Sequence, residues 1–210
     1  MNCHIKIIKL LLFAIIMFGM VSCKTGIVED AMVEGPADVT LFQQYMLDEI
    51  NLARTDPATY ADLRLKTDYD NSADNGSYLF LKNSVAVGAI TFNSCLNESA
   101  SNYAIFLAEK NLAEHNADGT PLKRAIRAGF TGSSTGENIA IASENIFNAN
   151  VNPQSAAIGF VRILLIDKGV EDIGHRLILM NSKYTFVGIG FMRNSSSTVL
   201  NYLVQDFGKL

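Results

Sequence analysis

The sequence predicts an α+β fold in which helices cover an antiparallel sheet. Two observations support this prediction. Segments with apolar residues at helical spacing fill most of the chain before residue 170, and two β-rich segments, 184–193 and 198–207, close it as a hairpin around a short polar turn. A length of 210 residues suits a single domain. No internal repeat divides the chain.

The N-terminal segment predicts export. Lys6 and Lys9 precede an uncharged, almost wholly apolar run from Leu10 to Val21. As a helix this run would rise only about 18 Å, whereas a bilayer core measures about 30 Å. A short apolar run behind a positive start is typical of a secretory signal peptide, which we place at residues 1–22.

The end of that segment also predicts a lipid anchor. Met20, Val21 and Ser22 before Cys23 resemble a bacterial lipobox, in which the cysteine is lipidated and becomes the new N-terminus. Each buried CH₂ of the acyl chains contributes about 0.8 kcal/mol to membrane binding. We therefore expect a cell-envelope lipoprotein with a tether over 23–39 and a domain over 40–210. Lys24 favours an outer membrane by resemblance; a plain secreted protein is the alternative.

The first helices follow from spacing and capping. Phe42, Met46, Ile50 and Ala53 recur at steps of four and three, which predicts a helix from Thr40 onward. Asp56 before Pro57 predicts a second, short helix that reaches Leu65. Residues 66–84 are rich in Asp, Asn and Ser, and we expect a surface loop with one short apolar contact at 78–81.

The remaining elements have similar signals. Residues 94–112 show the strongest helical periodicity. Thr120-Pro121 and Asn152-Pro153 predict the starts of two more helices, which end at Gly129 and Gly169. Residues 136–143 are a candidate third strand. In the first strand of the hairpin, Gly188 and Gly190 predict either close packing against that strand or a bulge.

Composition excludes some classes of protein. The net charge of −4 argues against a nucleic-acid partner, which requires a basic face. Of three cysteines, Cys3 and Cys23 lie in or next to the signal segment, so an intrachain disulfide framework is not expected. We interpret Cys95 as a buried small hydrophobic residue, which is the commoner role of a single cysteine.

Three residues are candidates for chemistry. The sequence contains no nucleotide-binding or serine-hydrolase motif and no H-E-x-x-H motif, so no organic cofactor is expected. Processing would leave His115 and His175 as the only histidines, and Glu137 lies beside an apolar segment. Each residue alone is better explained by a structural role. Together in one cleft, two imidazoles and a carboxylate could hold zinc or another divalent metal.

A series of motifs in order resembles the CAP superfamily of cysteine-rich secretory proteins, antigen 5 and pathogenesis-related proteins. The motifs are Ile50-Asn51…Arg54…Pro57…Tyr60-Ala61, Ile90-Thr91-Phe92-Asn93, His115…Asp118-Gly119-Thr120-Pro121, Gly136-Glu137-Asn138-Ile139-Ala140, Gly174-His175-Arg176 and Tyr184-Thr185-Phe186-Val187-Gly188-Ile189-Gly190. The chain resembles the bacterial, disulfide-free branch of that family. The resemblance spans roughly residues 41–207.

This resemblance implies an α-β-α sandwich with a cleft lined by two histidines and two acids. His115 matches the first histidine, Glu137 matches the glutamate of the G-E-N motif, and His175 matches the histidine of the G-H-R motif. For the second acid we favour Glu171, with Asp167 and Asp172 as alternatives.

Three functions remain open at this level. The first is a ligand-binding module in which His115 and His175 hold a metal and the ligand is a small molecule, lipid, glycan or envelope protein. The second is a metal-dependent hydrolase of peptide or cell-wall substrates, with Glu137 as general base and Glu171 assisting. The third is a purely structural polar cluster. The sequence leaves open whether the protein is an enzyme.

Overall fold

The computed structural model describes residues 33–34, 39–170, 172–197 and 199–210. The expected signal peptide, the lipid-attachment residue Cys23, most of the expected tether, and Glu171 lie outside these residues. In the part of the chain that is described, no helix combines the length and hydrophobicity needed to span a membrane.

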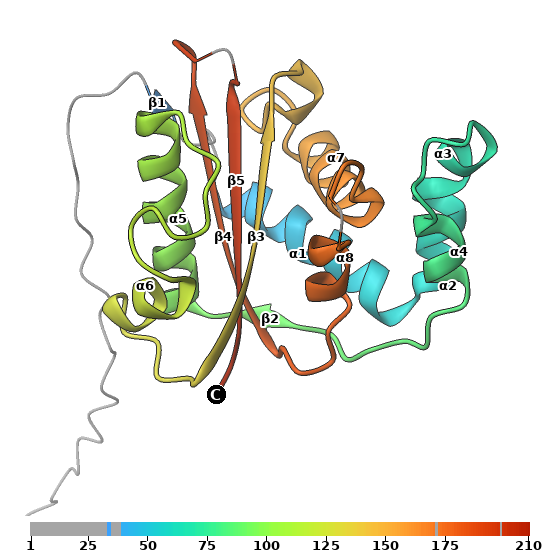
Figure 1. Ribbon diagram of the computed structural model, residues 1–210, viewed down its shortest axis with the longest axis horizontal. Coiled ribbons are helices and arrows are strands. Elements are labelled where there is room, and N and C mark those ends of the chain that lie inside the picture. Colours follow the sequence, from blue (N-terminus) through green and yellow to red (C-terminus); the bar gives the residue numbers. More distant parts are fainter. Residues whose placement is uncertain (1–32, 35–38, 171, 198) are drawn as a thin grey trace, which may run out of the picture.

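A five-stranded sheet forms the central layer of the described residues (Figure 1). The predicted hairpin is present as β4 (Phe186–Asn194) and β5 (Asn201–Lys209), and the predicted third strand is β3 (Ser134–Ala142), which pairs antiparallel with β5. Two short strands, β1 (Val33–Glu34) and β2 (Thr91–Phe92), pair with β4. Part of the expected tether therefore joins the sheet, and β3 lies at one end of it.

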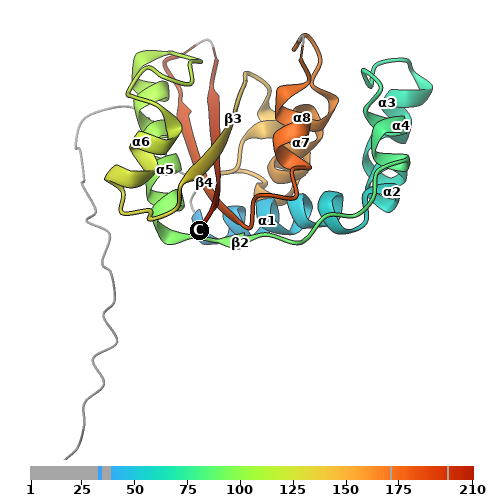
Figure 2. The ribbon, with the colours of Figure 1, turned by 60° about the horizontal axis from the view of Figure 1, so that its bottom comes forward.

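Helices cover both faces of the sheet, as Figures 1 and 2 show. One layer contains α5 (Ser94–Lys110) and α6 (Pro121–Arg127); the other contains α1 (Val39–Thr55), α7 (Pro153–Ile166) and α8 (Gly174–Leu179). The expected caps are present, since the side chains of Thr120 and Asn152 accept backbone N–H bonds of α6 and α7. The predicted α+β class and α-β-α sandwich are confirmed.

Close approach of α5 to β4 explains the two glycines of that strand. A Cβ on Gly188 would lie 2.0 Å from the carbonyl carbon of Leu96, and one on Gly190 would lie 2.2 Å from the carbonyl oxygen of Ala100. Any larger side chain would push the helix off the sheet. Of the two alternatives, close packing is therefore correct.

The opposite face of the sheet carries the larger core. Phe42, Met46 and Ile50 of α1 are fully buried, and the ring of Phe42 lies 5.1 Å from that of Phe191 in β4. The buried Arg54 guanidinium donates to backbone carbonyls on both sides of the α8–β4 connection, those of Leu179 and Tyr184 included. Burial lowers the Arg54 pKa to about 10. Arg54 thereby anchors the segment that follows α8.

For residues 66–84 the predicted apolar contact at 78–81 is present, but the predicted surface loop is wrong. The expected second helix is present as α2 (Pro57–Tyr60) and a π-helical turn (Ala61–Leu65), but it continues into α3 (Lys66–Asp70), and a further helix, α4 (Ser77–Lys82), follows. Asp68 pairs with Arg162 of α7, and Leu81 is fully buried. These tertiary contacts outweigh the loop-forming composition. A short 3₁₀ turn (Asn145–Phe147) precedes α7.

Candidate functional site

His115 and Glu137 form the first half of the site. His115 lies in the loop between α5 and α6, and Glu137 lies in β3. The Nδ1 atom of His115 is 2.8 Å from Oε1 of Glu137, whose side chain is almost fully buried. A neutral imidazole that donates from Nδ1 leaves Nε2 as a lone-pair donor for a metal or a ligand proton.

Arg124 of α6 holds this pair in place. Its guanidinium is buried and donates to the second oxygen of Glu137 and to the backbone carbonyl of His115. The guanidinium also stacks on the ring of Tyr103, at 3.4 Å from the ring centroid. The Tyr103 hydroxyl in turn bonds the backbone on both sides of His115, at Glu114 and Ala117. Two helices therefore fix the loop that presents the imidazole.

A second buried acid, Asp206 of β5, lies behind Glu137. The two residues face each other in the β3–β5 register, and Ser99 of α5 donates to Asp206 Oδ2 at 2.6 Å. The other oxygen of Asp206, Oδ1, is buried and accepts no bond from a described N–H or O–H donor, but the protonated carboxyl can hydrogen-bond the side chain of Glu137. Burial, and after it the charge of Glu137, raise the pKa of the Asp206 carboxyl well above its ordinary value. Burial next to Glu137 therefore favours the protonated form of Asp206.

His175 and Asp167 form the second half of the site. Asp167 ends α7 in the left-handed conformation, with a φ of 57°, and its side chain is completely buried. Its Oδ1 lies 2.7 Å from His175 Nδ1, and its Oδ2 accepts the backbone N–H of Arg176 in α8. The turn at the end of α7 thus directs the carboxylate back toward the first turn of α8.

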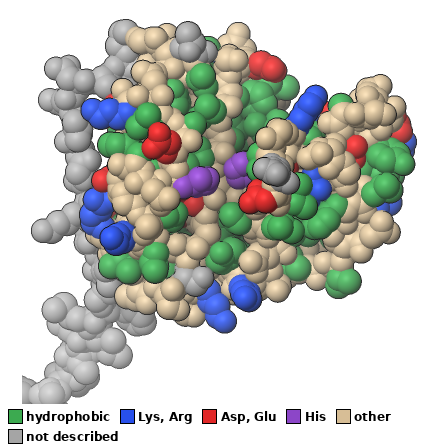
Figure 3. Space-filling view, in the orientation of Figure 1, with side chains coloured by type: hydrophobic (Ala, Val, Ile, Leu, Met, Phe, Trp, Pro, Cys, Tyr) green, Lys and Arg blue, Asp and Glu red, His purple; other side chains and the backbone are tan. Residues whose placement is uncertain are grey.

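The two pairs meet at β3. Glu137 contacts His115, and the next residue, Asn138, donates to the backbone carbonyl of His175. Consecutive strand residues point to opposite faces of a sheet, so the two histidines reach β3 from its two sides. Figure 3 shows the two histidine side chains close together near the centre of one face. The structure thus places His115 against Glu137 and His175 beside the next residue of β3.

Three acids were considered from the sequence as partners of His175. Among the described residues, Asp167 is the one whose carboxylate contacts the His175 ring. Asp172 accepts the backbone N–H of Gly174 instead, and Glu171 lies outside the described residues. The left-handed turn after α7 therefore brings Asp167, the most distant of the three acids along the chain, to His175.

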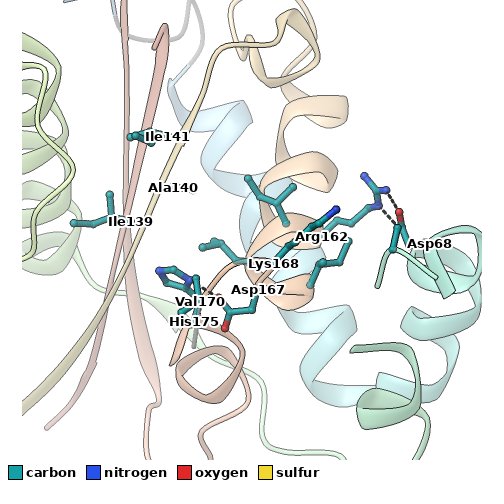
Figure 4. Close-up of a pocket in the computed structure, with 13 residues that line it drawn as sticks. Asp68, Ile139, Ala140, Ile141, Arg162, Asp167, Lys168, Val170 and His175 are labelled. Carbon is teal, nitrogen blue, oxygen red and sulfur yellow. Dashed lines mark hydrogen bonds and ion pairs between the residues drawn. The ribbon is translucent and has the colours of Figure 1, made fainter. Parts of the chain in front are cut away.

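A cavity of about 530 Å³ adjoins the second pair (Figure 4). It lies between β3 and the end of α7, with His175 and Asp167 in its lining. Most of its walls are apolar: Ile139, Ala140, Ile141, Ile163, Leu164, Ile166 and Val170. Its size falls within the range of small-ligand sites, about 300–1,000 Å³.

Two members of the site were missed by sequence reasoning. Arg124 belongs to a short helix whose basic residues look like an ordinary solvated face. Asp206 belongs to a segment that looks like an apolar strand. A signal for Asp206 existed, because Asp206 and Gln205 are the only polar side chains within the run from Tyr202 to Phe207. Cys95, in contrast, is buried as expected.

Comparisons with known proteins define the class of the chain. A model of the cysteine-rich secretory protein family, CAP, matches residues 47–207. The chain therefore belongs to the CAP family, as its motifs indicate. No curated protein matches it.

Two bacterial proteins of known structure are similar to the chain. An outer surface protein from Borrelia burgdorferi is 19% identical, with a TM-score of 0.52, and the match covers 84% of this chain and 98% of that one. An extracellular protein containing a SCP domain from Bacillus anthracis is 16% identical, with a TM-score of 0.48, and the match covers 84% of this chain but 45% of that one. At such identities the first likeness supports the fold alone.

Proposed function

We propose that this CAP-domain chain is an exported, lipid-anchored protein that binds a ligand in the cleft between its two histidine–carboxylate pairs. In this proposal, His115 and His175 together hold a divalent metal such as zinc. One observation supports it above the others: each imidazole has its Nδ1 occupied by a buried carboxylate. This arrangement orients a histidine and leaves Nε2 available for a metal.

Placement in the cell envelope rests on the N-terminal segment. The short apolar run before Ser22-Cys23 supports export and lipid attachment at Cys23. The name of the similar Borrelia protein, an outer surface protein, is consistent with this placement. An outer-membrane location remains part of the proposal.

The donor set fits a weakly held metal that is shared with a ligand. The described residues contain no group of three or more His, Cys, Asp or Glu side chains placed to hold a metal ion. Two imidazoles would therefore leave coordination positions for water or for an oxygen of the ligand. A divalent ion there would supply a positive centre for such an oxygen. Glu137 and Asp167 would fix the orientation and tautomer of the two rings.

The hydrolase alternative gains no specific support. A catalytic zinc site ordinarily has three protein ligands, and no described side chain joins the two histidines as a third. Glu137, the expected general base, has its two oxygens occupied by His115 and Arg124. These contacts suit a residue that orients the imidazole better than one that activates water.

Zinc titration by calorimetry tests the proposal. His115→Ala and His175→Ala should each weaken zinc binding by at least about tenfold, because each removes one of two protein ligands. Asn116→Ala is the matched control, since its side chain is exposed beside His115 without belonging to the site. If both histidine variants bind zinc as tightly as the parent chain, the proposed site is wrong.

A further inference from the structure

The strand that separates the two histidines has an open edge. β3 is the last strand in the order β1-β4-β5-β3. The backbone carbonyls of Leu200, just before β5, and of Gly208 in β5 accept hydrogen bonds from residues at the two ends of β4. The backbone N–H and C=O groups of even-numbered β5 residues therefore point toward β4, and those of odd-numbered residues point toward β3. By the register, the even-numbered residues of β3 bond to β5. The backbone groups of Glu137, Ile139 and Ile141 therefore point away from the sheet.

These outward groups are unpaired within the described chain. No described residue donates to or accepts from the backbone of Glu137, Ile139 or Ile141 outside the β3–β5 ladder. Open edges are usually blocked by charges, prolines or bulges, because they can pair with another extended chain. β3 has a continuous register with β5 and no proline, and Ile141 is an exposed apolar residue on it.

The large cavity lies against this open edge. Its lining includes three consecutive residues of β3: Ile139, Ala140 and Ile141. Because neighbouring side chains of a strand point to opposite faces, a cavity that touches three in a row meets the strand at its edge. Figure 4 shows the side chains of Ile139 and Ile141 on the side of β3 away from α7, so the strand meets the cavity with its backbone edge, and His175 lies at one end. The cavity is therefore a groove along the strand.

The chemistry of the groove selects among ligand classes. A lipid chain would fill the apolar wall formed by Ile163, Leu164 and Ile166 but would leave the backbone groups of β3 without partners, which is costly away from water. A peptide backbone offers donors and acceptors at the spacing of β3, and its alternate side chains can reach that wall.

The charges of the groove favour an uncharged stretch of peptide. Asp68 pairs with Arg162, and Asp167 contacts His175. Among the described residues, only Lys168 lines the cavity with a charge that has no partner. The groove therefore offers little attraction for a strongly charged ligand, apart from one cation at its rim.

We propose that the ligand of the cleft is an extended peptide segment, which adds as a further strand to the open edge of β3 and passes beside His175. This inference rests on the proposed function, because it names the ligand class of the same cleft. It does not require the metal.

Amide hydrogen exchange tests the open edge directly. In the full chain without ligand, the N–H groups of Ile139 and Ile141 should exchange faster than those of Asn138 and Ala140, which bond to β5. A linear heptapeptide selected from a random displayed library on the full chain is the probe. Its binding should slow exchange at Ile139 and Ile141 by about tenfold or more while leaving Asn138 and Ala140 unchanged. Equal exchange in the unliganded chain would overturn the proposal.

Methylation of the peptide backbone supplies the second measurement. A pairing strand uses only every second N–H toward β3, so N-methyl groups at alternate positions should weaken binding by about tenfold, and those between them should have little effect. An absence of any selected peptide, or a uniform response along it, contradicts strand addition.

A variant of the chain completes the test. Ile141→Pro removes one outward N–H without removing a bond to β5, and edge strands tolerate proline. Peptide binding should weaken about tenfold, whereas the matched control Ile141→Val should bind normally. Zinc titration of both variants separates the two proposals. If no peptide binds as a strand but zinc binding still depends on the two histidines, only the ligand class is rejected. If a peptide binds as a strand but zinc binding does not depend on the histidines, only the metal site is rejected.

Discussion

Each of the two histidine–carboxylate pairs has a contact between imidazole Nδ1 and a carboxylate oxygen, but the surroundings of the two contacts differ. The Nδ1–oxygen distances are 2.8 Å for His115–Glu137 and 2.7 Å for His175–Asp167. The second oxygen of Glu137 bonds the Arg124 guanidinium, whereas that of Asp167 accepts a backbone N–H. The His115 side chain is 48% exposed and that of His175 is 20% exposed.

This difference separates two ways of holding an imidazole. The first pair depends on a side-chain cation from α6 and on a second acid, Asp206, behind it. The second pair depends on the backbone where α7 turns into α8. Removal of one partner of a buried ion pair leaves an uncompensated charge, which costs more than the loss of a neutral bond. The first pair should therefore be the more sensitive to single substitutions.

The largest effect is expected at Arg124. Arg124→Met should keep most of the packing on Tyr103 but leave Glu137 buried without its cation, and should lower the free energy of unfolding by about 3–5 kcal/mol. Urea unfolding measures this. Arg127→Met, one turn further along α6, removes an exposed ion pair with Asp118 and should cost at most about 1 kcal/mol. Similar losses for both variants would show that the buried cluster is not held by this charge.

A second effect, of opposite sign, is expected at Asp206. Its carboxyl pKa is raised in the folded chain, so the folded state retains a proton that the unfolded state releases above pH 4 or so. The contribution of Asp206 to the free energy of unfolding is therefore fully present below the pKa of the unfolded chain. It is lost as the pH rises from that value through the higher pKa of the folded chain. Asp206→Asn imitates the protonated acid and does not titrate.

The variant should thus gain stability relative to the parent chain as the pH rises. The gain should grow by about 1.4 kcal/mol per pH unit while the parent Asp206 stays protonated, and should vanish near pH 4. Urea unfolding from pH 4 to 7 measures the slope. Asp118→Asn at the surface is the control and should show no comparable slope. A gain that does not change between pH 4 and 7 would mean that Asp206 is ionised in the folded chain.

Local signals along the chain were enough to predict most of the fold. Thr120 and Asn152 cap helices because their side chains reach backbone groups only three residues away. The hairpin follows from a turn signal between two β-rich segments. Residues 66–84 were mispredicted because their helices depend on contacts that local composition does not contain. Asp68 pairs with Arg162, which lies far along the chain.

The candidate site shows the same division between local and distant information. His115, Glu137 and His175 were chosen as candidates by residue type and motif, without information on distant contacts. Arg124 and Asp206 were missed because only the sheet register and the packing of α6 bring them to Glu137. The contact of Asp167 with His175 depends on the left-handed conformation of Asp167 at the end of α7, and the sequence carries no glycine at that position to mark it. Charges brought together by tertiary structure are thus the part least visible in the sequence.

The smallest of the three effects is expected at Asp167, and it measures how far the backbone alone holds the second pair. Asn also adopts the left-handed conformation readily and can still accept the Arg176 N–H. Asp167→Asn should therefore lose only the charge assistance of the His175 contact, about 1–2 kcal/mol of the free energy of unfolding. Asp167→Ala should cost more, because it also leaves that N–H buried without a partner and because alanine adopts the left-handed conformation less readily than Asp or Asn. Urea unfolding of both variants gives the ranking, and a loss for Asp167→Asn as large as that for Arg124→Met would mean that both pairs are held by charge.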